Sequence, residues 1–305
     1  ELHISISSEV CPEIREFERF TTTAINAYIK PLMSRYLKSL ETNLKRSGFN
    51  SSFLLMTSGG SLTNVKNASD FPVRLVESGP AGGVILANSV ARELNLDQVI
   101  SFDMGGTTAK ITIIQNKNPN KAREFEVDRK SRFQKGSGLP VRIPVIEMVE
   151  IGAGGGSIAR INKLDQITIG PDSAGSSPGP ACYGLGGKNP TITDADLIVG
   201  KLNPKNFAAG KIELFPENSK NVINNNIAKN LNFSLEDASI GITEMVDETM
   251  ANAARVHSVE QGHQTENKTL IAFGGAAPLH VSRIAEKLKV KKIIVPTNAS
   301  VGSAI

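Results

Sequence analysis

VISFDMGGTTAKITIIQ, residues Val99–Gln115, is the stretch on which the interpretation of the whole chain depends. Apolar, largely β-branched residues lie on both sides of the pair Gly105–Gly106, and this pattern predicts two strands joined by a tight turn. Because glycine has no Cβ atom, its backbone can approach a ligand closely, and successive N–H groups can then converge on an anion. The stretch therefore predicts a hairpin that can bind phosphate.

The polar residues of this hairpin agree with that interpretation. Asp103 stands at the end of the first predicted strand, where a carboxylate can hold a cation or orient a water molecule. Thr107 and Thr108 add two hydroxyl donors beside the glycines. A phosphate group with its metal ion suits this set. A plain hairpin whose polar side chains satisfy only their own turn is an equal alternative.

The composition limits the possible classes of function. The chain has 305 residues, a length typical of about two domains, and a net charge of +4. Basic and aromatic residues do not alternate, so we expect no binding of nucleic acid. The sequence shows no apolar run of membrane-spanning length and no signal-peptide pattern, so we expect no membrane association. Only two cysteines occur, far apart in the sequence, which favours a cytoplasmic location.

Two long helices are predicted from the sequence. Apolar residues recur every three or four positions from Phe17 to Leu44, and Gly48 is well suited to follow the end of that helix. A second helix is expected to begin after Ser234, which with Asp237 forms a variant of the capping box, and to end at Gly262.

A second glycine-rich segment lies at Ile151–Ala159, IGAGGGSIA. So many glycines after a predicted strand increase the conformational entropy lost on folding. This cost is understandable if the backbone must pass very close to another group, which a side chain would prevent. That group is either a ligand, which we favour, or a neighbouring strand. A third glycine pair, Gly274–Gly275, stands between a predicted strand and a predicted helix. Another strand follows at Ile293–Val295, so a crossover between parallel strands is expected.

Residues 170–190 are rich in glycine, proline and serine but lead directly into a helix start. Thr193 or Asp194 can cap a helix predicted at Leu197–Leu202, and we therefore interpret the segment as an ordered active-site loop. Asp194 is alternatively a general base or a metal-binding carboxylate. For Cys182 a packed thiol is favoured over a nucleophile, because no histidine lies nearby in the sequence.

Five sequence blocks together resemble a known family. In chain order they are SFDMGGTTAK, EIGAGGGSIA, GPDSAGSSPGPACYG, PTITDADLIVGKL and LIAFGGAAPLHV. They resemble the A-type subunits of the hydantoinase/5-oxoprolinase/acetone carboxylase family, and the resemblance extends over nearly the whole chain. It implies an α/β fold of the actin/sugar-kinase/Hsp70-like (ribonuclease H-like) ATPase type. In that fold two Asp–Gly–Gly–Thr hairpins, one in each lobe, grip the nucleotide phosphates from opposite sides.

The resemblance also implies that the fold is incomplete in this chain. DMGGTT is its single Asp-x-Gly-Gly-Thr motif and resembles the second hairpin, so the hairpin of the first lobe is missing. We expect residues 1–98 to be the end of the first lobe with the long helix, and residues 99–305 to be the second lobe. The chain is expected to be an internal segment of a longer polypeptide and to be inactive alone.

Roles for individual residues follow from the resemblance. Asp103 is expected to be catalytic, as a ligand of Mg²⁺ (or Mn²⁺) or by positioning water, and Asp194 and His280 are further catalytic candidates. The residues expected to bind ATP, through its phosphates or its adenosine, are Gly105, Gly106, Thr107, Thr108, Gly154, Gly155, Gly156, Gly274, Gly275 and Ala276.

The activity implied is ATP-dependent opening of a cyclic amide, of the hydantoin or 5-oxoproline type, through phosphorylation of the carbonyl oxygen. A B-type subunit is the expected partner. The segments Ala254–Val259 and Val149–Gly156 favour slightly an alternative, an ATP-dependent ketone carboxylase of the acetone type. A nucleotide-binding regulatory ATPase is a further alternative, but it would not need the glycine-rich loops. A sugar kinase is another, and the release of free inorganic phosphate instead of a stable phosphorylated product would exclude it.

Overall fold

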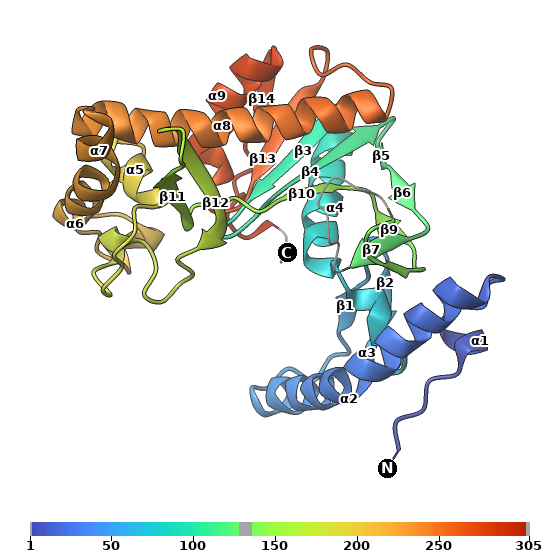
Figure 1. Cartoon of the computed structure of the whole chain (residues 1–305). Coiled ribbons are helices and arrows are strands. Elements are labelled where there is room, and N and C mark those ends of the chain that lie inside the picture. The colour runs from blue at the N-terminus through green and yellow to red at the C-terminus, as the bar shows by residue number, and fades with distance from the viewer. Residues whose placement is uncertain (1, 128–135, 303–305) are drawn as a thin grey trace. The chain divides into compact units, whose positions relative to one another are not determined.

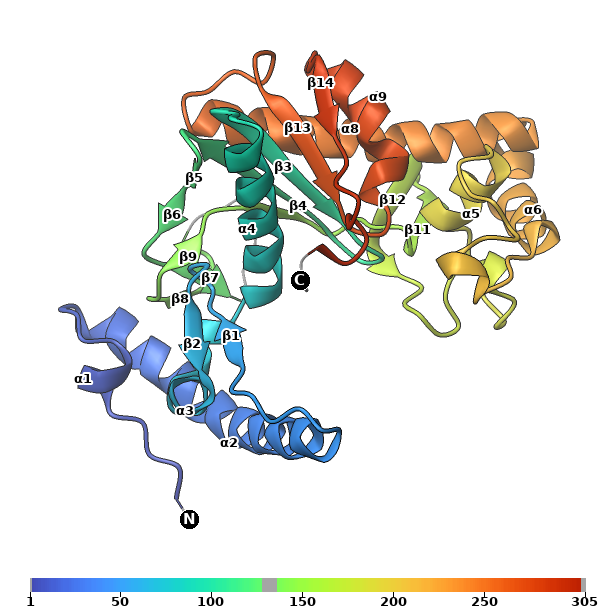
Figure 2. The same cartoon turned by 180° about the vertical axis from the view of Figure 1, so that it is seen from behind.

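The computed structural model describes residues 2–127 and 136–302, which have a mixed α/β architecture. The chain divides into two compact units, drawn in Figures 1 and 2. The first unit contains the chain up to Ser89 and the segment Pro119–Glu147, and the second contains Val90–Asn118 and Met148–Gly302. The sequence predicted a division between residues 98 and 99. In the structure residues 90–98 belong instead to the second unit, and residues 119–147 belong to the first.

The long helix α2 (Glu16–Arg46) belongs to the first unit and confirms the helix predicted from the apolar period. Gly48 follows the C-cap of α2 with a φ of +86°, which glycine adopts without steric cost. The buried Asn26 donates to the carbonyl of Asp70 (3.1 Å) and accepts the N–H of Val73 (3.2 Å). The other elements of this unit are α1 (Ser7–Val10), β1 (Leu54–Met56), β2 (Leu62–Asn64), α3 (Val65–Asp70), most of α4 (Ser78–Glu93), β6 (Lys121–Ala122), β7 (Phe125–Val127), β8 (Leu139–Val141) and β9 (Val145–Ile146).

A mixed sheet is the centre of the second unit. Its strand order is β10 (Val149–Ile151), β4 (Ala109–Gln115), β3 (Gln98–Met104), β13 (Thr269–Phe273) and β14 (Lys292–Ile294), with the short β5 (Asn118–Pro119) paired to β4. β3 and β4 are antiparallel, which confirms the predicted hairpin. β13 is parallel to both β3 and β14, which confirms the crossover through α9 (Ala277–Leu288).

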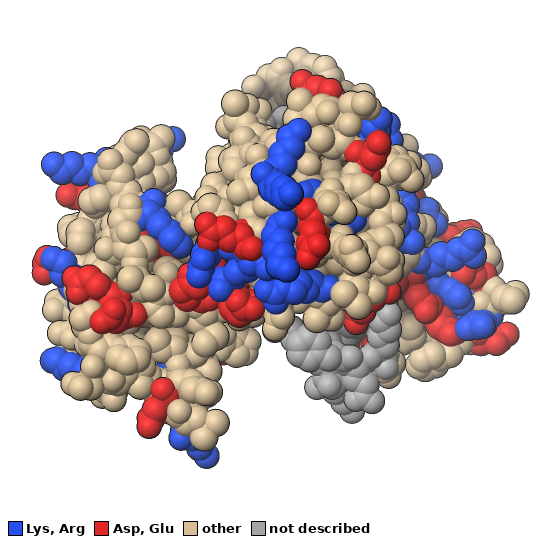
Figure 3. All heavy atoms as spheres, turned by 90° about the horizontal axis from the view of Figure 1, so that it is seen from above, with Lys and Arg blue, Asp and Glu red and all other residues tan. Residues whose placement is uncertain are grey.

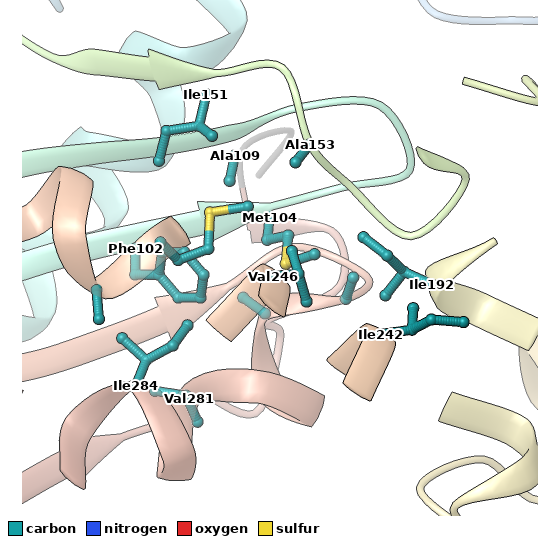
Figure 4. Close-up of a cluster of buried hydrophobic side chains, with 14 of the residues drawn as sticks. Phe102, Met104, Ala109, Ile151, Ala153, Ile192, Ile242, Val246, Val281 and Ile284 are labelled. Atoms are coloured by element: carbon teal, nitrogen blue, oxygen red, sulfur yellow. The ribbon is translucent and has the colours of Figure 1, made fainter. Parts of the chain in front are cut away.

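The core of the second unit lies between this sheet and two helices. Helix α8 (Leu235–Glu260) begins as predicted after Ser234, whose hydroxyl oxygen accepts the N–H of Asp237 at 3.0 Å. Figure 4 shows side chains from α8 and α9 meeting Phe102 and Met104 of β3. Because successive residues of a strand point to opposite faces, Asp103 lies on the face of the sheet away from Phe102 and Met104.

The region after β10 holds α5 (Ile192–Ile198), α6 (Pro216–Ile223), α7 (Lys229–Leu231) and the hairpin β11 (Ser157–Ile161) with β12 (Ile167–Ser173). The cap predicted for α5 was wrong. The N-cap is Thr191, with extended backbone, and Asp194 is the third helical residue. The side chains of these two residues bond to each other's backbone N–H in a capping box, which starts the helix five residues earlier than predicted.

The exposed sides of α8 and α9 carry charges of both signs. Figure 3 shows acidic and basic side chains intermingled on the face viewed there. Between the two helices, Glu244 pairs with Arg283 at 2.6 Å and with Lys287 at 3.0 Å. Such exposed pairs contribute little stability each, about 0–1 kcal/mol. In the described part of the chain, no helix has both the length and the hydropathy needed to cross a membrane.

Candidate functional site

The tip of the β3–β4 hairpin is open on its outer side. Met104 pairs with Ala109, and the N–H of Gly105 donates to the carbonyl of Thr108 at 3.1 Å, which closes a four-residue turn. A Cβ atom added to Gly105 or Gly106 would meet no described atom within 4 Å, and neither residue has a positive φ. Neither backbone strain nor a protein contact therefore demands glycine here. The backbone of the turn is therefore left accessible at both positions.

The second glycine segment packs directly on this turn. Gly155 and Gly156 donate their N–H groups to the carbonyls of Gly105 (3.0 Å) and Gly106 (2.7 Å). A Cβ on Gly154 would lie 2.6 Å from the nitrogen of Thr107. Of the two explanations given by the sequence, the neighbouring backbone accounts for Gly154, and the ligand that we favoured is not needed to explain it. The segment thus holds the hairpin tip in place.

The third glycine segment lies against the base of the same hairpin. Gly274 has a φ of +94°, and a Cβ there would lie 2.5 Å from both Asp103 Oδ1 and the carbonyl oxygen of Met104. The N–H of Ala276 donates to that carbonyl at 2.9 Å. Gly275 is exposed, with open space around its Cβ position. The second and third glycine segments therefore both contact the hairpin, one at its tip and the other at its base beside Asp103.

Asp103 is partly buried at the base of the hairpin, next to Gly274. It stands opposite Lys110 on β4 and Phe273 on β13. Burial raises the pKa of its carboxyl group, and the nearby positive charge of Lys110 works in the opposite direction. In the described residues no group of three or more histidine, cysteine, aspartate or glutamate side chains is suited to hold a metal ion. Asp103 is thus a single carboxylate, which for Mg²⁺ would need further oxygen ligands from a bound molecule.

Asp194 has a different environment from the one predicted for a base or metal ligand. Its side chain is fully buried and accepts hydrogen bonds from the backbone N–H groups of Ala181 (3.2 Å), Cys182 (2.8 Å) and Thr191 (3.0 Å). The hydroxyls of Thr191 (2.7 Å) and Ser219 (2.6 Å) also donate to it. Five donors saturate a carboxylate, so the geometry makes Asp194 the anchor of the loop before α5 and leaves no oxygen lone pair for a substrate.

His280 is likewise fully buried, and both of its ring nitrogens face carboxylates. Its Nδ1 lies 2.8 Å from Asp247 on α8, and its Nε2 lies 3.1 Å from Asp196 on α5. Burial lowers the pKa of His280, but the two carboxylates raise it further, to about 9. We assign a proton to both ring nitrogens on this ground, so that His280 is an imidazolium between two aspartates. The sequence did not predict Asp196 or Asp247 as its partners.

For two other residues, Thr193, which the sequence suggested only as a helix cap, and Lys110, sequence reasoning did not predict the contacts that they make. Thr193 donates its hydroxyl proton to the carbonyl of Gly155 at 2.8 Å, which fixes the middle of the glycine segment. Lys110 donates to the hydroxyl oxygen of Thr108 at 2.9 Å. A signal for Lys110 was available, because a four-residue turn between positions 104 and 109 places Lys110 opposite Asp103.

Cys182 is expected to be chemically inert in the folded protein. Its side chain is fully buried, and burial together with the neighbouring Asp194 raises the pKa of the thiol well above its usual range. Under native conditions iodoacetamide should therefore label neither Cys182 nor the buried Cys11, whereas both should react after denaturation. Mass spectrometry of the labelled peptides tests this, and rapid native labelling of Cys182 would reopen its role as a nucleophile.

Comparison with known proteins connects this geometry to a family. Residues 19–305 match the family described as Hydantoinase/oxoprolinase. A protein of Methanocaldococcus jannaschii is 43% identical over 98% of this chain and 44% of its own length. The caprolactamase subunit alpha of Pseudomonas jessenii is 35% identical over 96% of this chain and 41% of its own length. A solved structure of nucleotide-free acetone carboxylase is similar in backbone, with a TM-score of 0.86 and 28% identity. The similarity covers 98% of this chain and 41% of the acetone carboxylase chain.

The chain thus spans less than half the length of these relatives. The match nevertheless covers the hairpin, the glycine segments and the loop before α5, which are the parts that the structure brings together. The chain belongs to the hydantoinase/oxoprolinase family.

Proposed function

We propose that this chain is the phosphate-binding part of an enzyme subunit that uses ATP to open a cyclic amide. The observation that carries this proposal is the open turn at Gly105–Gly106, held from one side by Gly154–Gly156 and adjoined at its base by Gly274. A backbone turn of this kind, with Asp103 beside it, presents N–H donors to an anion without side chains in the way.

The fold that we propose is that of the actin/sugar-kinase/Hsp70-like ATPases. Three features support it: the β3–β4 hairpin, the parallel pairing of β13 with β3, and the contact of Gly274–Ala276 with the hairpin base. In that fold a second phosphate hairpin faces this one. The sequence has no second Asp-x-Gly-Gly-Thr motif, so we propose that this chain supplies half of the phosphate grip.

The residues present fit ATP with Mg²⁺ (or Mn²⁺). The space around Gly105 and Gly106 leaves room for phosphate oxygens, and Thr107 and Thr108 add hydroxyl groups. Asp103 supplies the one carboxylate that Mg²⁺ commonly takes from a protein when phosphates and water complete its coordination. When bound, ATP would supply the phosphoryl group, and the metal ion would neutralise part of the negative charge of the phosphates. The role of this chain's residues is to position that group.

The chemical requirement explains why a cyclic amide needs ATP. An amide carbonyl is a poor electrophile, and phosphorylation of its oxygen activates the carbon toward water. In this step an O–P bond forms at the amide oxygen, and the bond from the terminal phosphorus to the bridging oxygen breaks, which releases ADP. Water then adds to the activated carbon, the ring C–N bond breaks as the nitrogen takes a proton, and a second water hydrolyses the remaining acyl phosphate. The products are the ring-opened carboxylic acid, ADP and inorganic phosphate. Backbone N–H groups at the hairpin tip would stabilise the negative charge that develops on the phosphoryl oxygens.

A second candidate function is ATP-dependent ketone carboxylation, which begins with the same phosphorylation. Sequence identity to caprolactamase subunit alpha, 35%, is higher than to acetone carboxylase beta subunit, 29%, and this supports the hydrolase, although the segments Ala254–Val259 and Val149–Gly156 favour the carboxylase slightly. The backbone favours the carboxylase, with a TM-score of 0.86 against 0.78 for ATP-dependent caprolactamase. Both relatives are named as subunits, so we propose that a partner, of the B type, completes the active enzyme.

Release of inorganic phosphate by the full-length polypeptide with its partner subunit tests this function. The substrates to compare are caprolactam, 5-oxoproline, hydantoin, and acetone with bicarbonate. We expect one cyclic amide to stimulate release. Asp103→Asn should reduce that stimulated rate by about 10²-fold, the scale seen when one group that stabilises transition-state charge is removed.

Asp165→Asn is a matched control, because Asp165 is exposed in the turn between β11 and β12, away from the hairpin. It should retain the wild-type rate. Stimulation by acetone with bicarbonate alone would select the carboxylase. Tight ATP binding with no stimulation by any of the four would argue for a regulatory ATPase, and a stable phosphorylated product would argue for a kinase.

A further inference from the structure

Lys110 is the single lysine or arginine within the hairpin sequence Val99–Gln115, and neither the sequence motif nor the glycine contacts explain it. Its side chain is 19% exposed and lies on the same face of the sheet as Asp103. Nζ donates to Thr108 Oγ1 at 2.9 Å and pairs with Glu150 Oε1 at 3.1 Å. A lysine ammonium has three N–H donors, so these two contacts leave a third N–H available.

The register of the sheet explains how Lys110 is held. Lys110 on β4 stands between Asp103 on β3 and Glu150 on β10, so three charged residues cross three adjacent strands in one row. The side chain of Glu150 is 47% exposed, and its carboxylate pulls the ammonium toward the outer strand. Lys110 therefore stays close to Thr108 instead of collapsing onto Asp103, with which no hydrogen bond is formed.

The contact with Thr108 fixes the direction of a second donor. An ammonium group cannot accept a hydrogen bond, so Thr108 Oγ1 must be the acceptor in this contact. The hydroxyl proton of Thr108 is then free to be donated to another group. An ammonium and a hydroxyl donor side by side, next to an open backbone turn, form an arrangement that suits an anion with several oxygens.

From these contacts we propose that Lys110 binds a phosphate oxygen of the nucleotide and orients Thr108 as a second donor to it. Glu150 acts on this pair as a positioning residue. This inference rests on the proposed ATP-dependent function and extends it, because it names the cation that the half-site in this chain contributes.

Equilibrium binding of Mg²⁺–ATP and of adenosine to the full-length polypeptide tests the inference. Lys110→Met should weaken ATP binding by about 10- to 100-fold, the range expected for one charge-assisted hydrogen bond, and leave adenosine binding unchanged. Lys110→Arg should recover part of the affinity. Glu150→Gln should weaken ATP binding by a smaller factor, because the ammonium remains but is less well held.

Lys117→Met is the matched control, because Lys117 lies beyond the far end of β4 and bonds there to Asn95 at 2.6 Å. It should bind ATP as the wild type does. ATP affinity of Lys110→Met within twofold of wild type, or an equal loss of ATP and adenosine binding, would overturn the inference while the ATP-dependent function stood. Failure of the wild type to bind ATP at all would overturn both.

Discussion

A Gly154→Val variant is expected to lose at least about 10²-fold in kcat/KM for ATP-dependent turnover, because displacement of a catalytic element by about 1 Å has effects of this size. The first added carbon would lie 2.6 Å from the Thr107 nitrogen and 2.7 Å from the carbonyl oxygen of Gly105. These are backbone atoms, which cannot rotate away. The hairpin tip and the glycine segment must therefore separate, and the bonds from Gly155 and Gly156 to the turn are strained or broken.

The same overlap should lower stability by about 1–3 kcal/mol, as overpacking of a dense interior does. Steady-state kinetics and urea unfolding measure the two effects. Gly152→Ala is the control in the same segment, since its Cβ would meet only Pro171 at the ordinary distance of 3.9 Å. It should be close to wild type in both assays. A Gly154→Val enzyme with unchanged turnover would show that the tight contact has no importance for the site.

His280→Leu is expected to lower the free energy of unfolding by about 3–5 kcal/mol, the cost of leaving buried charges without their partner. Asp196 and Asp247, both almost fully buried, would face each other without the imidazolium between them. Lys201, 3.3 Å from Asp196, can compensate one carboxylate only in part. Asp196 is on α5 and His280 on α9, so the loss should also loosen α5 from the core.

Chemical denaturation of His280→Leu tests this expectation, and the triple variant that also carries Asp196→Asn and Asp247→Asn separates charge from shape. Removing both charges should restore part of the lost stability, because the penalty comes mainly from unpaired carboxylates. His263→Leu, beyond the end of α8, should have little effect. Loss of less than about 1 kcal/mol in His280→Leu, the range of an ordinary surface substitution, would refute the assigned charge of the cluster.

The pH dependence of stability follows from the same cluster. The pKa of His280 is raised from an ordinary 6.5 to about 9 in the folded protein. The folded state therefore holds this proton more tightly, and its contribution is complete below pH 6.5 and is lost as the pH rises through about 9. Lys201, 3.5 Å from Nδ1, is the like charge that opposes it. The fall in stability over this range should be absent in His280→Leu.

Local sequence patterns were sufficient for some elements of the second unit, but not for the start of α5. Apolar strands flanking Gly105–Gly106 predicted the β3–β4 hairpin, and Ser234 with Asp237 predicted the start of α8. Both depend on interactions between residues close in the chain. The family resemblance added the expectation that the three glycine segments meet at one site. In the structure the second and third segments both contact the hairpin that carries the first.

The partners of the remaining polar residues were decided by tertiary structure. Whether Gly154 faces a ligand or the backbone of Thr107 depends on a contact between segments far apart in the sequence. Asp194 resembled a catalytic carboxylate in the sequence, but its donors include Cys182 and Ser219, which folding brings to it from both sides. The sequence by itself determined the β3–β4 hairpin, the long helices α2 and α8 and the close backbone approach at Gly154, because these follow from dihedral preferences and apolar periodicity. Only the tertiary structure decided which carboxylates are saturated and which is left open, because hydrogen-bond donors are supplied by distant segments.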